Sequence, residues 1–163
     1  MEYWFAGGGR TNSNRRALPL LMKTLHTLLV IAFTLSSAFA TPPTWGDDVS
    51  KAISQATKEN KMGFILAGRE NCGNCQATKK MVNEGKIAVT AETFVAAEIN
   101  IDAARDYAEF ERKFKKEKFG NTLPFVVITD AKGKPLASYS GYKSAEQLNA
   151  LVAEAKGKAT MKK

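Results

Sequence analysis

The two cysteines of the chain stand three positions apart, within residues 69–76, where an apolar segment typical of a strand gives way to a segment typical of a helix. Gly73 and Asn74 separate Cys72 from Cys75. At a helix start, unpaired N–H groups and the positive end of the helix dipole face the first sulfur and stabilise a thiolate. The second sulfur can then close a disulfide. Because so short a ring removes little entropy from the unfolded chain, the pair is expected to serve redox chemistry rather than stability.

Counting ligands argues against a metal or haem role for this pair. A structural zinc site needs four ligands, and the chain has two cysteines and a single histidine, His26. Covalent haem attachment needs a histidine directly after the second cysteine, where Gln76 stands. We therefore expect neither a metal nor a cofactor at the motif.

The N-terminal part of the chain has the features of a cleaved secretory signal peptide. Met22 and a lysine are followed by the apolar run 25–35, which is too short for a membrane anchor, and by a small-x-small site formed by Ala38 and Ala40. Met22 is the expected translation start. The sequence predicts an N-terminal extension with a cleaved signal peptide (1–40), a leader (41–46), a folded domain (47–156) and a basic tail (157–163).

Cleavage after Ala40 would leave a soluble mature protein outside the cytoplasm, in the periplasm or secreted, where a disulfide can form. The general secretory route is the expected one. The arginine pair at residues 15–16 leaves the twin-arginine route open.

The formal net charge of +8 does not by itself indicate a nucleic-acid partner. Much of the basic charge lies in the run 112–118 and in the tail, and no basic motif interleaved with aromatic residues accompanies it. The run is expected to be a solvated helix face, although it could also steer an acidic partner. About 120 residues after the signal peptide suffice for one domain with its own core, expected to be a monomer.

Hydrophobic periodicity predicts alternating helices and strands. The expected elements are a helix capped by Asp47 or Asp48 and running to about residue 60, a strand at 62–67, a helix at 77–84, a strand at 94–101, a helix from 103 to about 118, a hairpin of strands 125–129 and 136–140, and a last helix opened by a Ser144/Gln147 capping box. Strands separated by helices pair in parallel, and the hairpin adds an antiparallel edge. The predicted fold class is α/β, with a central mixed sheet between helices.

Four features at matching separations make the chain similar to the thioredoxin-like family over roughly residues 45–155. They are the Cys72–Cys75 motif after a buried strand, Asn100-Ile101-Asp102 at the end of the next strand, Thr122-Leu123-Pro124 before the hairpin, and Gly141 after it. The resemblance implies the thioredoxin fold, with helices on both faces of the sheet. It further implies an exported thiol–disulfide oxidoreductase whose active motif is Cys-Gly-Asn-Cys.

The resemblance also implies roles for individual residues. Cys72 is then the attacking thiol and Cys75 the resolving thiol. The Leu123–Pro124 bond is cis, and a client peptide pairs with the Leu123 backbone as an added strand. Leu123, Pro124 and Gly141 are thus the expected substrate-binding residues. The implied partners are protein thiols or disulfides, together with a redox partner.

The motif departs from that of thioredoxins in three places. Asn71 replaces the usual tryptophan before the first cysteine, and Asn74 replaces a proline. Leu66 replaces the buried aspartate that commonly assists the resolving thiol. Because an apolar side chain accepts no proton, water, Glu70 or another nearby residue is expected to do so. The segment 102–122 is also longer than in the compact thioredoxins.

Two other functions stay open on the sequence alone. The domain could bind clients without catalysis while its disulfide stays inert, or it could relay electrons to one dedicated partner. The redox direction is open too. The helix start favours the reduced form, to which Arg69, Lys79 and Lys80 could add, whereas Glu70 opposes it.

Overall fold

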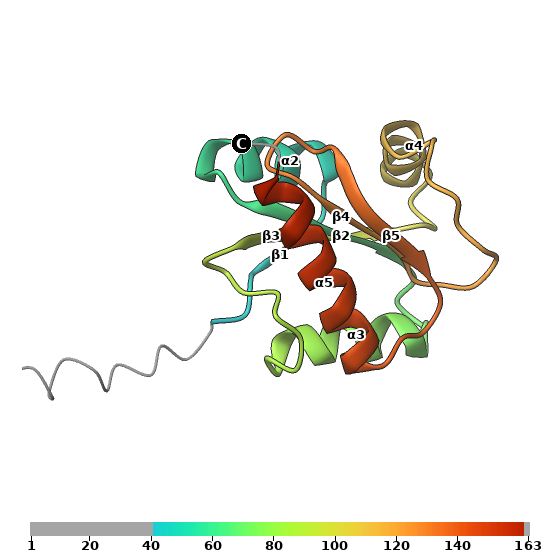
Figure 1. The fold of residues 1–163 in the computed structure, drawn as a ribbon. Helices are drawn as coiled ribbons and strands as arrows, with labels where there is room; N and C mark the ends of the chain where they lie inside the picture. The colour runs from blue at the N-terminus through green and yellow to red at the C-terminus, as the bar shows by residue number, and fades with distance from the viewer. Residues whose placement is uncertain (1–40, 162–163) are drawn as a thin grey trace, which may run out of the picture. The chain divides into compact units, whose positions relative to one another are not determined.

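A five-stranded sheet with the strand order β1-β3-β2-β4-β5 organises residues 41–161, the part of the chain that the computed structural model describes (Figure 1). Four helices accompany it in this part. The elements are β1 (Trp45–Gly46), α2 (Val49–Glu59), β2 (Met62–Gly68), α3 (Gly73–Asn83), β3 (Phe94–Asn100), α4 (Ala104–Lys113), β4 (Phe125–Thr129), β5 (Pro135–Ser140) and α5 (Ala145–Thr160).

The central strand β2 pairs in both directions. It runs parallel to β3, from Met62 opposite Phe94 to Gly68 opposite Asn100. It runs antiparallel to β4, while β1 is parallel to β3 and β5 is antiparallel to β4. The mixed sheet expected from the order of elements is therefore confirmed. β2 is almost continuously apolar because both of its faces are buried.

Each face of the sheet is covered by two helices. Phe64 and Leu66 of β2 belong to a core cluster that includes apolar residues of α3 and α5. Ile65 and Ala67 point to the other face, where the cluster includes residues of α2 and α4. Figure 1 shows α5 crossing the first of these faces. Alternation along a single strand thus builds both halves of the core, and the α/β fold class is confirmed.

The helix starts follow the capping signals of the sequence. Asp48 is the N-cap of α2, and its carboxylate accepts a hydrogen bond of 2.8 Å from the Lys51 N–H. Ser144 and Gln147 form the predicted capping box of α5. Both caps satisfy N–H groups that the helix itself leaves unpaired.

Several element bounds differ from the prediction. The end of the expected leader, Trp45–Gly46, forms β1, which at two residues is too short to show any periodicity. Helix α3 begins at Gly73 rather than at residue 77. Helix α4 ends at Lys113 rather than near 118, since the lysines that follow repel one another at helical spacing. Helix α5 reaches Thr160, inside the expected tail.

The predicted signal peptide, with Met22, His26 and the cleavage site after Ala40, lies outside the described residues. These expectations therefore stay predictions. Within residues 41–161, no helix combines the length and the apolar character needed to cross a membrane.

Candidate active site

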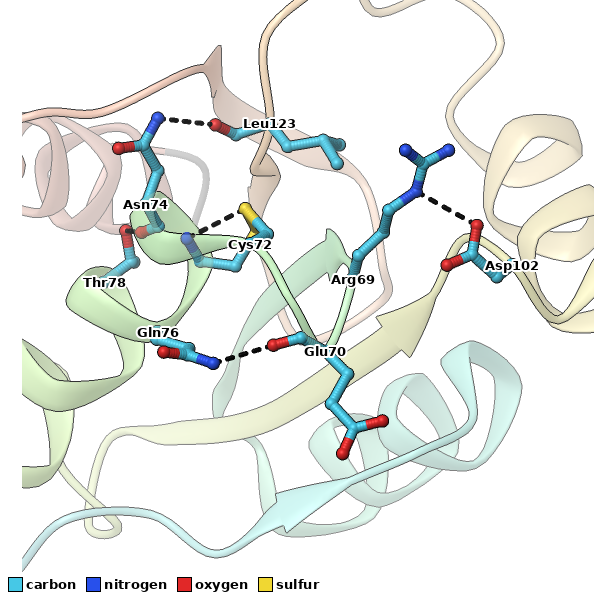
Figure 2. Close-up of a disulfide and its surroundings, with 9 residues drawn as sticks. Arg69, Glu70, Cys72, Asn74, Gln76, Thr78, Asp102 and Leu123 are labelled. Carbon is cyan, nitrogen blue, oxygen red and sulfur yellow. Dashed lines mark hydrogen bonds and ion pairs between the residues drawn. A yellow bond between two sulfur atoms is a disulfide. The ribbon is translucent and has the colours of Figure 1, made fainter.

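The candidate site begins where β2 ends and α3 starts. After Gly68 the chain turns, and the Cys72 N–H donates a hydrogen bond to the Arg69 carbonyl at 3.2 Å. Cys72 is then the N-cap of α3, and its Sγ accepts a hydrogen bond from the Cys75 N–H at 3.1 Å (Figure 2). A sulfur at this position faces the positive end of the helix dipole, so negative charge on it is stabilised.

The two sulfurs form a disulfide, with Cα atoms 5.2 Å apart. The cysteines differ in burial. Cys75 is fully buried in the core cluster of α3 and α5, whereas Cys72 is half-buried at its edge. An incoming thiol or disulfide therefore reaches Cys72 first. The attacking and resolving roles themselves stay predictions.

Gly68, at the end of β2, is a site residue that the sequence reasoning missed. A Cβ on residue 68 would lie 2.7 Å from the Cys75 Sγ and 3.1 Å from the Cys75 Cβ. Only glycine lets the strand backbone approach the buried sulfur this closely. The available signal was a glycine closing an apolar strand just before the motif.

The structure brings the Thr122-Leu123-Pro124 segment to the same place. The Asn74 Nδ2 donates a hydrogen bond to the Leu123 carbonyl at 3.3 Å, which joins this segment to the first turn of α3 (Figure 2). The Leu123–Pro124 peptide bond is cis, as the resemblance implies. Leu123 is half-buried, and Pro124 is buried.

Gly141 fixes the other side of this segment. Its N–H donates a hydrogen bond of 3.0 Å to the Pro124 carbonyl. Its φ of 76° lies in the left-handed region that favours glycine, and an added Cβ would meet Thr122 at 3.5 Å. Gly73 differs, since nothing lies within 4 Å of its hypothetical Cβ. Packing therefore does not explain the glycine inside the motif.

Charged side chains near the motif are largely paired. The cations expected to favour a thiolate each meet a carboxylate, namely Arg69 with Asp102, Lys79 with Glu98, and Lys80 with Glu84. Since each positive charge has a negative neighbour, their combined effect at the sulfur is smaller than the sequence suggested. The N-terminus of α3 directs positive potential at Cys72.

A hollow of about 750 Å³, lined mostly by charged and polar residues, borders the turn between β2 and α3. Gly68 lines it together with Glu70, Gln76 and Glu98. Leu66 is fully buried and offers no proton acceptor. Gly68 both lines this hollow and lies against the Cys75 sulfur.

In residues 41–161, no group of three or more histidine, cysteine, aspartate or glutamate side chains could hold a metal ion.

Comparison with known proteins agrees with this architecture. The family model described as a thioredoxin-like domain matches residues 49–156. None of the curated proteins compared with the sequence matches it.

Solved structures share the fold at low sequence identity. A mutant thioredoxin from Halobacterium salinarum is 17% identical, with a TM-score of 0.51, over 72% of this chain and 96% of the other. A putative disulphide-isomerase from Bacteroides thetaiotaomicron is 17% identical, with a TM-score of 0.50, over 73% and 97%. The structure of a complex between ferredoxin:thioredoxin reductase and thioredoxin f2 includes a chain that is 13% identical, with a TM-score of 0.51, over 72% and 98%. At such identities the likeness concerns the fold.

Proposed function

The chain belongs to the thioredoxin-like family, and on that premise we propose that it is an exported thiol–disulfide oxidoreductase acting on protein clients. The observation that carries the proposal is the position of Cys72, half-buried at the N-terminus of α3, with its sulfur accepting the Cys75 N–H. This arrangement favours the thiolate that disulfide exchange requires.

In the reducing direction, the Cys72 thiolate attacks one sulfur of a client disulfide. A Cys72–client bond forms, the client S–S bond breaks, and the released client sulfur takes up a proton. The Cys75 thiol then loses its proton and attacks the Cys72 sulfur. The Cys72–Cys75 disulfide forms, and the client leaves as a thiolate that is protonated in turn. In the oxidising direction the same steps run in reverse.

The supply of electrons completes the cycle. Each reduced client leaves the protein with the Cys72–Cys75 disulfide, so a dithiol partner must return two electrons and two protons before the next turnover. An oxidising cycle needs a disulfide partner instead. A redox partner of one of these two classes therefore belongs to the proposal.

The proposed client surface combines the exposed edge of Cys72 with Leu123, Pro124 and Gly141. Leu123 precedes β4, and its backbone is joined to the motif through Asn74. An extended client segment could pair with this backbone and so bring its own sulfur to Cys72.

Two variants test the catalytic proposal. The reduced mature protein should reduce insulin disulfides, and Cys72→Ser should abolish turnover. Cys75→Ser should retain attack at Cys72 but accumulate client proteins as mixed disulfides, because the resolving sulfur is gone. Wild-type protein without exchange activity, together with a Cys75→Ser variant that traps no client, would favour a binding module. Trapping of a single protein would favour a dedicated electron relay.

Export is a separate part of the proposal, and it rests on the apolar run and the small-x-small site before Thr41. Mass spectrometry of the protein purified from its own cells should find a mature N-terminus at Thr41. Retention of Met1 or Met22 would remove the argument for an oxidising compartment.

A further inference from the structure

The side chain of Asn74 makes a contact that disulfide exchange itself does not require. Its Nδ2 donates a hydrogen bond to the Leu123 carbonyl at 3.3 Å, between residues 49 positions apart in the sequence (Figure 2). Both residues are half-buried at the edge of the site. The Asn74 backbone is fixed on α3, since its carbonyl accepts a hydrogen bond from the Thr78 Oγ1 at 3.0 Å. The amide group can therefore turn while the backbone stays in place.

The neighbouring backbone at Pro124 offers a client no free hydrogen-bonding group. The Pro124 carbonyl accepts the Gly141 N–H, and Pro124 has no N–H to donate. The pairing of β4 with its neighbours begins at Phe125. The Leu123 carbonyl is thus an acceptor just outside the sheet, occupied in the described part of the chain by a side-chain amide rather than by a strand.

A carboxamide N–H and a peptide N–H are the same kind of donor to a carbonyl oxygen. An extended client segment that adds to the Leu123 backbone would direct a peptide N–H at this oxygen. The Asn74 amide therefore donates, in the free protein, to the same oxygen at which a client N–H would be directed.

We propose that the Asn74 amide competes with clients: it occupies the Leu123 carbonyl in the free protein and gives way to a peptide N–H when a client binds. The inference rests on the proposed function, since it assigns client recognition to the same site. No covalent step is added, because one hydrogen-bond donor replaces another. The residue therefore acts on peptide binding and not on the attack at sulfur.

The expected change in the peptide KM follows from the net free energy that one hydrogen bond contributes when its groups could otherwise bond to water. Removing the competing amide should lower the KM for a peptide roughly two- to tenfold. A small disulfide without peptide groups has no N–H to place on Leu123, so it provides the internal reference.

The experiment compares the wild-type full mature protein with its Asn74→Ala variant on two substrates. One is an extended peptide whose single cysteine is disulfide-bonded to 2-mercaptoethanol, and the other is 2-hydroxyethyl disulfide. The ratio of the peptide KM to the small-disulfide KM should fall roughly two- to tenfold in Asn74→Ala, with the ratio of the two kcat values retained. Asn74→Gln keeps an amide donor and should move the KM ratio back toward the wild-type value.

Peptides methylated on a single backbone nitrogen, before or after the cysteine, identify which client N–H donates to the Leu123 carbonyl. For at least one methylated peptide, the ratio of its KM to the small-disulfide KM should be the same in wild type and in Asn74→Ala. That peptide lacks the N–H that would replace the Asn74 amide at the Leu123 carbonyl. A KM ratio that is unchanged or raised in Asn74→Ala, or an advantage that survives every methylation, would overturn the inference while leaving the oxidoreductase proposal intact. Failure of the wild type on both substrates would overturn both.

Discussion

Gly68 and Cys75 are in direct contact, such that a Cβ on residue 68 would lie 2.7 Å from the Cys75 Sγ. The backbone of β2 is hydrogen-bonded to β3 and β4 up to this point, so it has little room to retreat. The buried sulfur is therefore located by a strand of the central sheet as well as by its own helix.

Gly68→Ala should destabilise the domain by about 1–3 kcal/mol, because an added methyl group forces Cys75 or the strand to move. Chemical denaturation of the oxidised protein measures the change. Gly73→Ala is the matched control, since it lies in the same segment with nothing within 4 Å of an added Cβ. It should be neutral or slightly stabilising. Equal losses in both variants would contradict the contact.

The reduced protein should react with iodoacetamide at Cys72 well before Cys75. Cys75 is fully buried, so its alkylation requires local opening, whereas Cys72 lies at the site edge and at a helix start. Mass spectrometry of quenched time points should show rates that differ by at least about tenfold. The single variants Cys72→Ser and Cys75→Ser separate the two rates, and comparable rates in them would refute the burial difference.

Thr129→Val should leave the stability unchanged or raise it by up to about 1 kcal/mol. The Thr129 Oγ1 is buried and has no hydrogen-bond partner among residues 41–161, so its removal relieves an unpaired polar group. Thr78→Val is the matched control, because the equally buried Thr78 Oγ1 donates to the Asn74 carbonyl. It should cost about 1–2 kcal/mol. Thermal unfolding of both variants measures the two changes in stability. A larger loss of stability in Thr129→Val than in Thr78→Val would contradict the prediction.

Asp48→Ala should cost about 0.5–2 kcal/mol near neutral pH, because it removes the N-cap of α2. The Lys51 N–H holds the pKa of the Asp48 carboxyl below its usual 3.8. A lowered folded-state pKa means that the stabilisation is present above the unfolded pKa and is lost as the pH falls through the folded one. Urea denaturation of wild type and variant between pH 7 and 3 should therefore show converging stabilities. Asp47→Ala, at an exposed neighbour, should change little at any pH.

Sequence patterns predicted the sheet, the two caps and the place of the cysteine pair because each depends on local spacing. The continuous apolar run of β2 and the Ser144/Gln147 box are examples. The contact of Gly68 with Cys75 depends on how α3 packs back against β2. The pairing of Lys79 with Glu98 depends on β3 lying beside β2. Both contacts form only when separate elements pack together, so periodicity carries no signal for either.

The prediction that nearby cations favour the Cys72 thiolate was limited in the same way, because it considered only local sequence. The positive charges of Arg69, Lys79 and Lys80 are visible in the sequence, but the carboxylate partners of Arg69 and Lys79 are not. Arg69 and Asp102 lie 33 positions apart and Lys79 and Glu98 lie 19 apart, so only the folded chain brings these partners together. The Lys80–Glu84 pair has the local i,i+4 spacing of a helix. The local sequence therefore overstated the positive electrostatic potential at the Cys72 sulfur.

The brevity of β1 has a consequence for self-association. In the described part of the chain, β1 pairs with only Ala96 and Ala97 of the seven residues of β3. The remainder of that edge would be a template for a foreign strand if it were flat and apolar. Glu98 stands at the next position and is held by Lys79 in a half-buried ion pair. Pairing a second chain there would bring this charge into the new interface, so Glu98 disfavours edge-to-edge association along β3.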